Sequence, residues 1–201
     1  MLQLKVVQQL IKSYDNQTIY RENGNSYLVL PLTDHIGATN PTVLREAVNA
    51  ICDVAKWFDK VEINKIVSEE EKGGFIAVAV ALQRNLPFTL AKQNPVRLPG
   101  EIGIKFKMDY SDKMSLYLNG VNSGDKILII EDIIATGGTM IAMIQAIRQA
   151  GAEIVDIVAL AEKVELGGVK KIFDQTGFLV KTILKLDCTG EKSRVVGVHS
   201  L

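Results

Sequence analysis

Residues 126–140 constrain the fold more than any other part of the chain. Their apolar run at 127–130 is too short for a globular helix and is rich in β-branched side chains, which is typical of a strand buried on both faces. Glu131 and Asp132 follow the run directly, and Thr-Gly-Gly-Thr at 136–139 then opens an apolar segment of helical length. This order predicts a strand, a tight loop and the start of a helix.

A loop of this kind directs backbone N–H groups to a point beside a helix N-terminus, where the helix dipole favours an anion such as phosphate. The two glycines let the backbone approach closely, and the hydroxyls of Thr136 and Thr139 can donate to the same anion. Carboxylates a few residues upstream cannot bind phosphate, but they suit sugar hydroxyls or a divalent metal. The stretch therefore predicts a site for a phosphorylated sugar.

Length and charge restrict the other possibilities. A chain of 201 residues is long enough for one well-buried α/β domain with a small subdomain. Lys plus Arg total 23 and Asp plus Glu total 23, so no net field attracts the chain to nucleic acid or a membrane, and neither is expected as a partner. The two cysteines have neither metal-ligand nor disulfide spacing. With no signal sequence or long apolar run, we expect a soluble protein in the cytoplasm.

The first sixty residues predict three elements. Residues 3–13 have the period of a short amphipathic helix. Residues 18–21 and 27–30 flank an Asn-Gly-Asn turn, which predicts a β-hairpin. Asn40 is a candidate N-cap for a long helix that continues to residue 57.

The rest of the chain alternates between strands and helices. Further strands are expected at 63–67, 88–90, 102–108, 115–118, 154–161, 179–186 and 194–198, and further helices at 75–82, 140–150 and 168–176. Such alternation predicts a mainly parallel sheet with helices on both faces, and folds of this type bind ligands beyond the carboxyl ends of the strands. Residues 69–73 and 131–139 both fall at such ends.

The stretch at 126–140 resembles the phosphoribosyl diphosphate (PRPP) signature of the type I phosphoribosyltransferases. Three further segments resemble adenine phosphoribosyltransferases in the same order: 70–75 is similar to Glu-Ala-Arg-Gly-Phe, 97–101 to Lys-Leu-Pro-Gly-Glu, and 162–168 to Glu-Leu-x-x-Leu-Gly-Gly. The N-terminal part looks more like the archaeal branch of purine enzymes, in which hypoxanthine and guanine users also occur.

The resemblance implies the type I phosphoribosyltransferase fold, an α/β architecture whose central, mainly parallel sheet carries helices on both faces. In that fold residues 1–40 supply a helix and hairpin to a hood over the base, and residues 41–201 form the core. A flexible β loop at about 92–117 closes over the site and excludes water.

The resemblance also implies a purine salvage reaction, in which 5-phosphoribose passes from PRPP to a purine nitrogen, diphosphate leaves and Mg²⁺ is required. Glu131 and Asp132 are the implied catalytic acids, which hold the ribose hydroxyls directly or through Mg²⁺. The 5-phosphate loop is implied to comprise Ala135, Thr136, Gly137, Gly138 and Thr139. Asp109 stands where the family has an acid that manages the purine proton, although the family residue is Glu.

Diphosphate contacts are implied for Glu71, Lys72 and Gly73, with Lys72 where the family has Arg. Gln93 and Asn94 replace an Arg-Lys pair of the family, which makes Lys92 or Arg97 the expected further contact.

The identity of the base depends on two residues with opposite implications. Adenine enzymes commonly carry Ala at position 135, whereas hypoxanthine and guanine enzymes commonly carry Asp there to handle a proton. Lys163, in contrast, lies where oxopurine enzymes place a lysine that donates to the 6-oxygen. The sequence favours adenine, with AMP as product, and leaves hypoxanthine or guanine as the alternative. The implied base-binding residues are Ile36, Gly37, Ile133 and Lys163.

A non-catalytic regulator that senses PRPP is a second alternative. Regulators with this fold usually append a basic or helix-turn-helix module, for which the first sixteen residues are too few. We also expect a homodimer, because this fold often completes its diphosphate site across a two-fold axis.

Overall fold

The computed structural model describes residues 7–22, 25–34, 36–55, 62–108 and 111–199. A six-stranded sheet in the order β10-β9-β8-β7-β3-β4 forms the centre, and β10 alone in this sheet is antiparallel to its neighbour. The strands are β3 (Lys65–Glu69), β4 (Phe88–Ala91), β7 (Lys126–Ile134), β8 (Glu153–Lys163), β9 (Lys181–Asp187) and β10 (Arg194–Val198).

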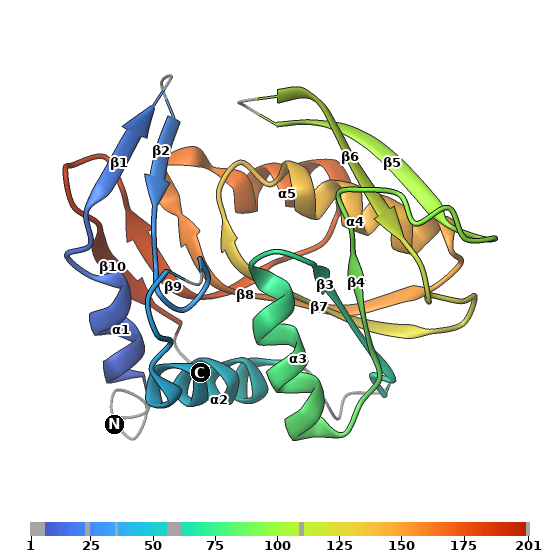
Figure 1. Ribbon diagram of the computed structural model, residues 1–201, viewed down its shortest axis with the longest axis horizontal. Coiled ribbons are helices and arrows are strands. Elements are labelled where there is room, and N and C mark those ends of the chain that lie inside the picture. The colour runs from blue at the N-terminus through green and yellow to red at the C-terminus, as the bar shows by residue number, and fades with distance from the viewer. Residues whose placement is uncertain (1–6, 23–24, 35, 56–61, 109–110, 200–201) are drawn as a thin grey trace.

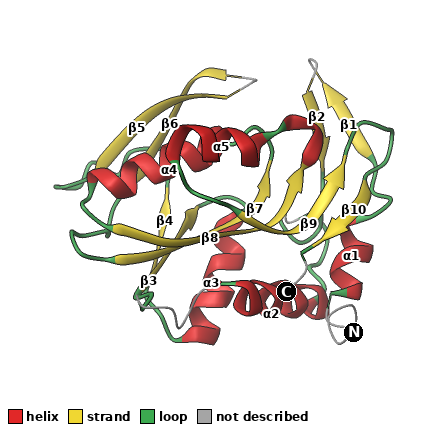
Figure 2. Cartoon of the chain, turned by 180° about the vertical axis from the view of Figure 1, so that it is seen from behind, coloured by secondary structure: helices red, strands yellow, loops and turns green. Residues whose placement is uncertain are grey.

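Helices cover both faces of the sheet (Figures 1 and 2). One face carries α1 (Gln8–Tyr14), α2 (Pro41–Val54) and α3 (Gly73–Arg84). The other carries α4 (Gly138–Gln149), α5 (Gly168–Thr176) and a hairpin of β5 (Ile102–Met108) and β6 (Ser111–Leu118), and a short 3₁₀ helix, η2 (Val164–Leu166), precedes α5. Within the described ranges, no helix combines the length and apolar character needed to cross a membrane.

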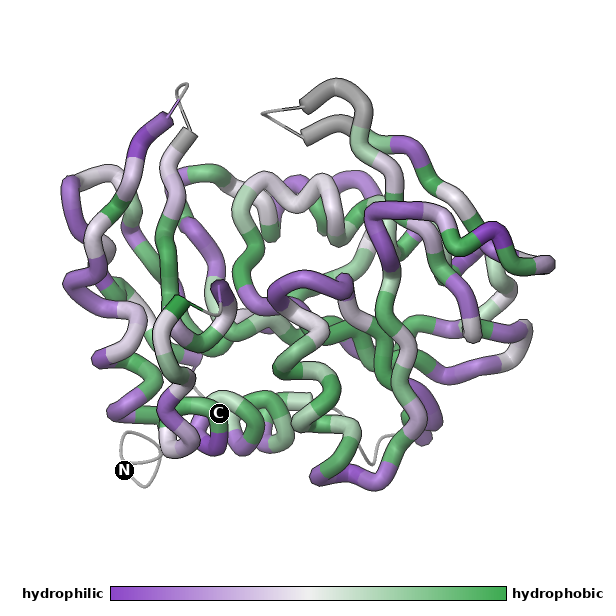
Figure 3. Tube along the Cα trace, in the orientation of Figure 1, coloured by the Kyte–Doolittle hydropathy of each residue, from purple (hydrophilic) through white to green (hydrophobic). Residues whose placement is uncertain are grey.

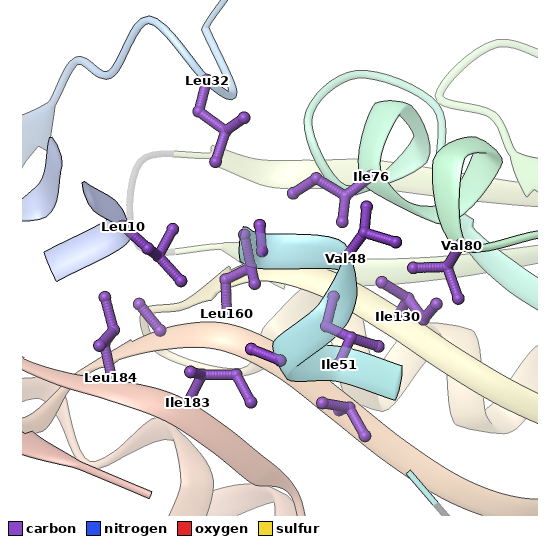
Figure 4. Packing of buried hydrophobic residues seen from close by; sticks show 14 of the residues in the cluster. Leu10, Leu32, Val48, Ile51, Ile76, Val80, Ile130, Leu160, Ile183 and Leu184 are labelled. Carbon is purple, nitrogen blue, oxygen red and sulfur yellow. The ribbon is translucent and has the colours of Figure 1, made fainter. Parts of the chain in front are cut away.

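Strand β7 is buried on both faces, as its apolar run predicts. Leu128 and Ile130 pack into the cluster under α1, α2 and α3 (Figure 4), while Ile127 and Ile129 pack into the cluster under α4 and α5. Successive side chains of a strand point to opposite faces, so a continuous apolar run is what two covered faces require.

A second hairpin, formed by β1 (Ile19–Glu22) and β2 (Asn25–Leu28), is separate from the main sheet. We call it the hood hairpin. It is anchored by the C-terminal segment: Ile19 N donates to Glu191 O at 2.9 Å, and Asn16 N donates to Ser193 O at 2.8 Å. In Figure 1 the hood hairpin and the β5–β6 hairpin stand apart from one another, and both extend toward the top of the view.

The fold class and the hairpin at residues 18–30 are confirmed, but one boundary matters for function. The sequence places Glu131 and Asp132 after the strand, whereas β7 continues to Ile134 and contains both acids. The strand is longer because β8 continues beside it, with Glu131 paired to Ala159 and Ile134 to Glu162. The acids are therefore held by a sheet ladder and not by a loop.

Several helices differ from the expected bounds. Helices α3 and α4 each begin two residues before the expected start, at Gly73 and Gly138, and Gly73 and Gly74 pack closely against β7 and β3. Helix α2 ends at Val54, and the remainder of the expected helix, 56–57, lies outside the described residues, as do residues 1–6 of the chain.

Candidate functional site

A cavity of about 620 Å³ opens at the carboxyl ends of the parallel strands, and residues of the hood hairpin and of β6 line its sides. Strands β3, β7 and β8 contribute Glu69, Glu131, Asp132 and Lys163 from their last residues. Parallel strands all end at one edge, so side chains from distant parts of the sequence meet there. The whole loop at 135–139 lines the same cavity.

The two acids of β7 form a buried pair. Glu131 is 4% exposed and Asp132 is 6% exposed, and Asp132 N donates to Glu131 Oε1 at 3.0 Å. Among the described residues, Glu131 Oε2 has no hydrogen-bond partner. Burial raises the pKa of Glu131 well above its ordinary value and raises the pKa of Asp132 to about 6. An unpaired carboxylate oxygen at this depth suits a ligand that brings donors or a cation.

Gly73 makes room for this pair. A Cβ atom at Gly73 would lie 2.4 Å from Glu131 Oε1 and 2.6 Å from Ser68 Oγ, which is closer than real Cβ contacts allow. The N-terminus of α3 thus rests directly on the acid pair, and only glycine permits this approach.

The loop at 135–139 turns into the N-terminus of α4. Gly137 is the N-cap and has φ of 81°, a conformation that glycine adopts without strain. Helix α5 supports the loop from behind, because a Cβ at Gly168 would lie only 2.1 Å from the Ala135 carbonyl oxygen. The geometry is that of an anion site at a helix N-terminus.

The loop that precedes α3 folds around the carboxylate of Glu69. The Glu69 carboxylate accepts hydrogen bonds from Glu71 N at 2.9 Å, from Gly73 N at 2.8 Å and from Lys72 N. The Lys72 ammonium forms an ion pair with Asp34 Oδ1 at 2.6 Å, and both residues line the cavity. Glu71 lines the cavity as well.

The other three expected diphosphate residues, Gly73, Lys92 and Arg97, are not part of the lining. Lys92 Nζ pairs with Glu70 Oε2 at 2.8 Å, and Gln93, not Lys92, lines the cavity. Arg97 is exposed, with its backbone N–H donating to Glu101 Oε2 at 3.0 Å. Asp109, the expected proton-handling acid, lies outside the described residues.

Ile133 and Lys163, two of the residues expected to bind the base, line the cavity. Lys163 is 8% exposed, and its ammonium donates to the Ser26 carbonyl of β2 at 2.8 Å. Burial lowers its pKa from the ordinary value. The structure does not bring Ile36 and Gly37 to the cavity: Ile36 is 64% exposed, and neither residue is part of the lining.

Several lining residues were not among those expected from the sequence. The hood hairpin contributes Arg21, Ser26 and Tyr27, and the segment after β9 contributes Cys188 and Thr189. The Arg21 guanidinium joins the two groups by donating to Thr189 O at 2.5 Å and Gly190 O at 2.8 Å. No local motif marks these positions, because they meet only through long-range pairing.

The described cavity lining is rich in acid. Its six carboxylic acids are Asp34, Glu69, Glu71, Glu131, Asp132 and Glu165, and its three cations are Arg21, Lys72 and Lys163. Within the ranges described, no group of three or more His, Cys, Asp or Glu residues is arranged to hold a metal ion.

Comparison with known proteins identifies the family. The model of the phosphoribosyl transferase domain matches residues 71–188. A hypoxanthine/guanine phosphoribosyltransferase of Methanothermus fervidus is 36% identical over 95% of this chain and 98% of its own length. A protein of the same name from Methanocaldococcus infernus is 40% identical over 83% of this chain and 88% of its own length.

Solved structures of adenine phosphoribosyltransferases have the same fold. The enzyme from Rhodothermus marinus has a TM-score of 0.74 and 25% identity and covers 91% of this chain and 99% of its own. The enzyme from Saccharomyces cerevisiae, solved with adenine, has a TM-score of 0.73 and 21% identity and covers 89% of this chain and 98% of its own.

These findings correct the expected base. The expectation of adenine relied on Ala135 and on short motifs, whereas the relatives at 36–40% identity over most of the chain are named for hypoxanthine and guanine. The fold and the reaction class, in contrast, are confirmed. The buried acid pair, the anion loop and the matching family model together show that this chain belongs to the phosphoribosyltransferase family, with the type I fold.

Proposed function

We propose that this protein transfers 5-phosphoribose from PRPP to hypoxanthine or guanine, releasing diphosphate and giving IMP or GMP. The observation that carries the proposal is the position of Lys163. Its ammonium is buried at the carboxyl end of β8, beside the hood, and lines the cavity. An ammonium has three donors and no acceptor, and one donor goes to the Ser26 carbonyl.

A 6-oxopurine complements this group, because its 6-oxygen accepts hydrogen bonds. Adenine presents an amino group at the same position, so a donor would face a donor across a desolvated gap. Such a mismatch leaves buried polar groups unpaired, which discriminates more strongly than a change in shape. The names of the close relatives support the same conclusion.

The acid pair and the two loops supply the remaining parts of the reaction. Glu131 and Asp132 accept from the ribose hydroxyls, and the 135–139 loop binds the 5-phosphate at the N-terminus of α4. Lys72 donates to the diphosphate, which gains negative charge as it leaves. The hood hairpin and the β5–β6 hairpin exclude water from the activated sugar.

Mg²⁺ is proposed as the cofactor and fits the residues present. The cavity lining holds twice as many acids as cations, so a substrate with several phosphate charges needs a divalent ion to offset repulsion. Glu131 has an unpaired oxygen among the described residues, and Mg²⁺ is commonly held by one or two carboxylates together with substrate phosphates. Bound in this way, the ion would neutralise charge on the leaving diphosphate.

A homodimer is also proposed, with α3 at the interface. Helix α3 is hydrophobic along most of its length (Figure 3), and Phe75, Val78 and Leu82 are 39%, 38% and 83% exposed. These residues recur at the spacing of one helix face. The helix begins at the diphosphate loop, so a partner there would lie beside the site. A cytoplasmic location without nucleic-acid or membrane partners remains part of the proposal.

Product identification tests the proposed function. Purified protein, PRPP and Mg²⁺ are incubated with adenine, hypoxanthine, guanine and xanthine together, and the nucleotides are identified by mass. We expect IMP and GMP. AMP as the sole product would refute the assignment of Lys163, and tight PRPP binding without any nucleotide would indicate a regulator.

A further inference from the structure

We propose that Asp34 is a positioning residue, which holds the Lys72 ammonium ready for diphosphate and keeps it away from Asp132. The inference rests on the proposed function, in which Lys72 contacts the diphosphate of PRPP. Asp34 lies in the loop after the hood hairpin, whereas Lys72 precedes α3, so their ion pair at 2.6 Å joins two separate walls of the cavity.

The position of Asp34 is fixed independently of Lys72. Its Oδ2 atom accepts from Leu30 N at 2.8 Å and from Thr33 Oγ1 at 3.4 Å, and its own N–H donates to Leu30 O at 2.8 Å. The Asp34 side chain is only 14% exposed. One carboxylate oxygen therefore closes the turn at 30–34, and the other faces the ammonium.

Three carboxylates compete for that ammonium. Burial lowers the pKa of Lys72, but the hydrogen bond that its ammonium donates to Asp34 and the charges of Asp132, Asp34 and Glu69 raise it above its ordinary value. Glu69 is already occupied, because its oxygens accept three consecutive backbone N–H groups. The remaining carboxylates that act on Lys72 are those of Asp34 and Asp132, and the ammonium pairs with Asp34.

The choice matters for substrate binding. An ammonium paired with Asp132 would occupy one of the two acids that receive the ribose hydroxyls, and PRPP would have to displace it. Paired with Asp34, the Lys72 side chain remains 44% exposed and retains donors for an incoming phosphate oxygen. A charge fixed before the substrate arrives costs less entropy on binding than one that must be ordered.

The substitution Asp34→Asn separates this role from that of the turn. The amide oxygen of Asn can still accept from Leu30 N, but the negative charge beside Lys72 is lost. We expect the KM for PRPP to rise about fivefold, in keeping with the loss of one half-exposed ion pair. The KM for hypoxanthine should stay within about twofold of wild type, since the hood turn persists.

Three further substitutions make the test specific. In a Lys72→Gln background, Asp34→Asn should cause no additional change in the KM for PRPP, because the interaction is already absent. Asp34→Glu keeps the charge and should restore most of the PRPP affinity. Asp125→Asn removes the negative charge of a Lys–Asp pair outside the cavity lining, with Lys65, and should leave the KM for PRPP unchanged; the Asp125 side chain is 18% exposed, close to the 14% of Asp34.

Three results would overturn the inference: an unchanged KM for PRPP in Asp34→Asn, a lowered one, or effects of Asp34→Asn and Lys72→Gln that simply add. A lowered KM would mean that Asp34 withholds Lys72 from the substrate. PRPP binding measured by calorimetry with Mg²⁺ tests the same pair without turnover. Failure of wild-type protein to use hypoxanthine or guanine would thus defeat the proposed function and still leave Asp34 testable.

Discussion

The Lys163 ammonium donates to the Ser26 carbonyl at 2.8 Å, although the two residues are 137 positions apart in the sequence. One hydrogen bond therefore links the hood hairpin to the end of β8 and at the same time orients a cation that lines the cavity. In the proposed function, base recognition and hood attachment would share this side chain.

Lys163→Met is expected to lower kcat/KM for hypoxanthine by about 10- to 100-fold, the usual cost of one hydrogen bond from a charged group. PRPP binding should change little, because the acid pair and both phosphate loops remain. Steady-state kinetics with each substrate varied in turn measure both effects. Equal losses for hypoxanthine and PRPP would point to a general structural role.

We also predict that the stability of wild type relative to Lys163→Met depends on pH. Burial lowers the pKa of Lys163, so the folded state binds this proton less tightly than the unfolded state, and wild-type stability rises as pH increases from the lowered pKa toward 10.5. Met does not titrate, so the free energy of unfolding of Lys163→Met should lack this rise with pH. Urea unfolding at pH 7 and pH 10 should show wild type gaining stability relative to the variant at the higher pH.

Asp132→Asn should reduce turnover on the order of 100-fold while preserving the fold. Burial raises the pKa of Asp132 from 3.8 to about 6, so wild-type protein loses stability as pH rises through that interval. The neutral Asn does not titrate, and the free energy of unfolding of the variant should exceed that of wild type by about 3 kcal/mol above pH 6. Below pH 4 the two proteins should unfold alike, and full activity of the variant would contradict the role of the acid pair.

Gly168→Ala should damage the 5-phosphate loop without touching any substrate. Its new methyl group would meet the Ala135 carbonyl oxygen at 2.1 Å, so either α5 or the loop must move. We expect the KM for PRPP to rise at least about tenfold. Gly190→Ala is the matched control, since a Cβ there meets nothing closer than 3.6 Å, and it should keep the wild-type KM.

Leu82→Glu should convert the proposed dimer to monomers. Leu82 is 83% exposed on α3, and a carboxylate there cannot be buried against a partner without a large desolvation cost. Leu179→Glu changes a residue that is 71% exposed elsewhere and should leave the association state unchanged. Sedimentation equilibrium distinguishes the two; a wild-type protein that is monomeric at all concentrations would refute the dimer.

Local patterns predicted the fold well, because the apolar runs of β7 and β8 and the glycine loops require little long-range information. The run at 127–130 could only be a strand covered on both faces, and Gly137 could be recognised as the residue that permits the turn into α4. The length of β7 was not predictable, because its last residues are strand only through pairing with β8.

The cavity-lining residues of the hood hairpin and of the segment after β9 were harder to predict than those at the ends of β7 and β8. Arg21, Ser26 and Thr189 reach the cavity through contacts between the two ends of the chain, which leave no periodic signal. The prediction of adenine as the base was wrong for a different reason. Ala135 has no functional group in its side chain, so it cannot by itself identify the base. Lys163, in contrast, supplies a charge that lies in the cavity at the end of β8.

The anchoring of the hood hairpin also sets the order in which the site can form. Residues 16–19 leave the ribosome early, but their partners Glu191 and Ser193 are synthesised more than 170 positions later. Contacts this distant in sequence form late in folding. We therefore expect a nascent chain to form the acid pair and the 135–139 loop before the hood hairpin is anchored. A chain stalled before residue 190 should then bind PRPP but no purine.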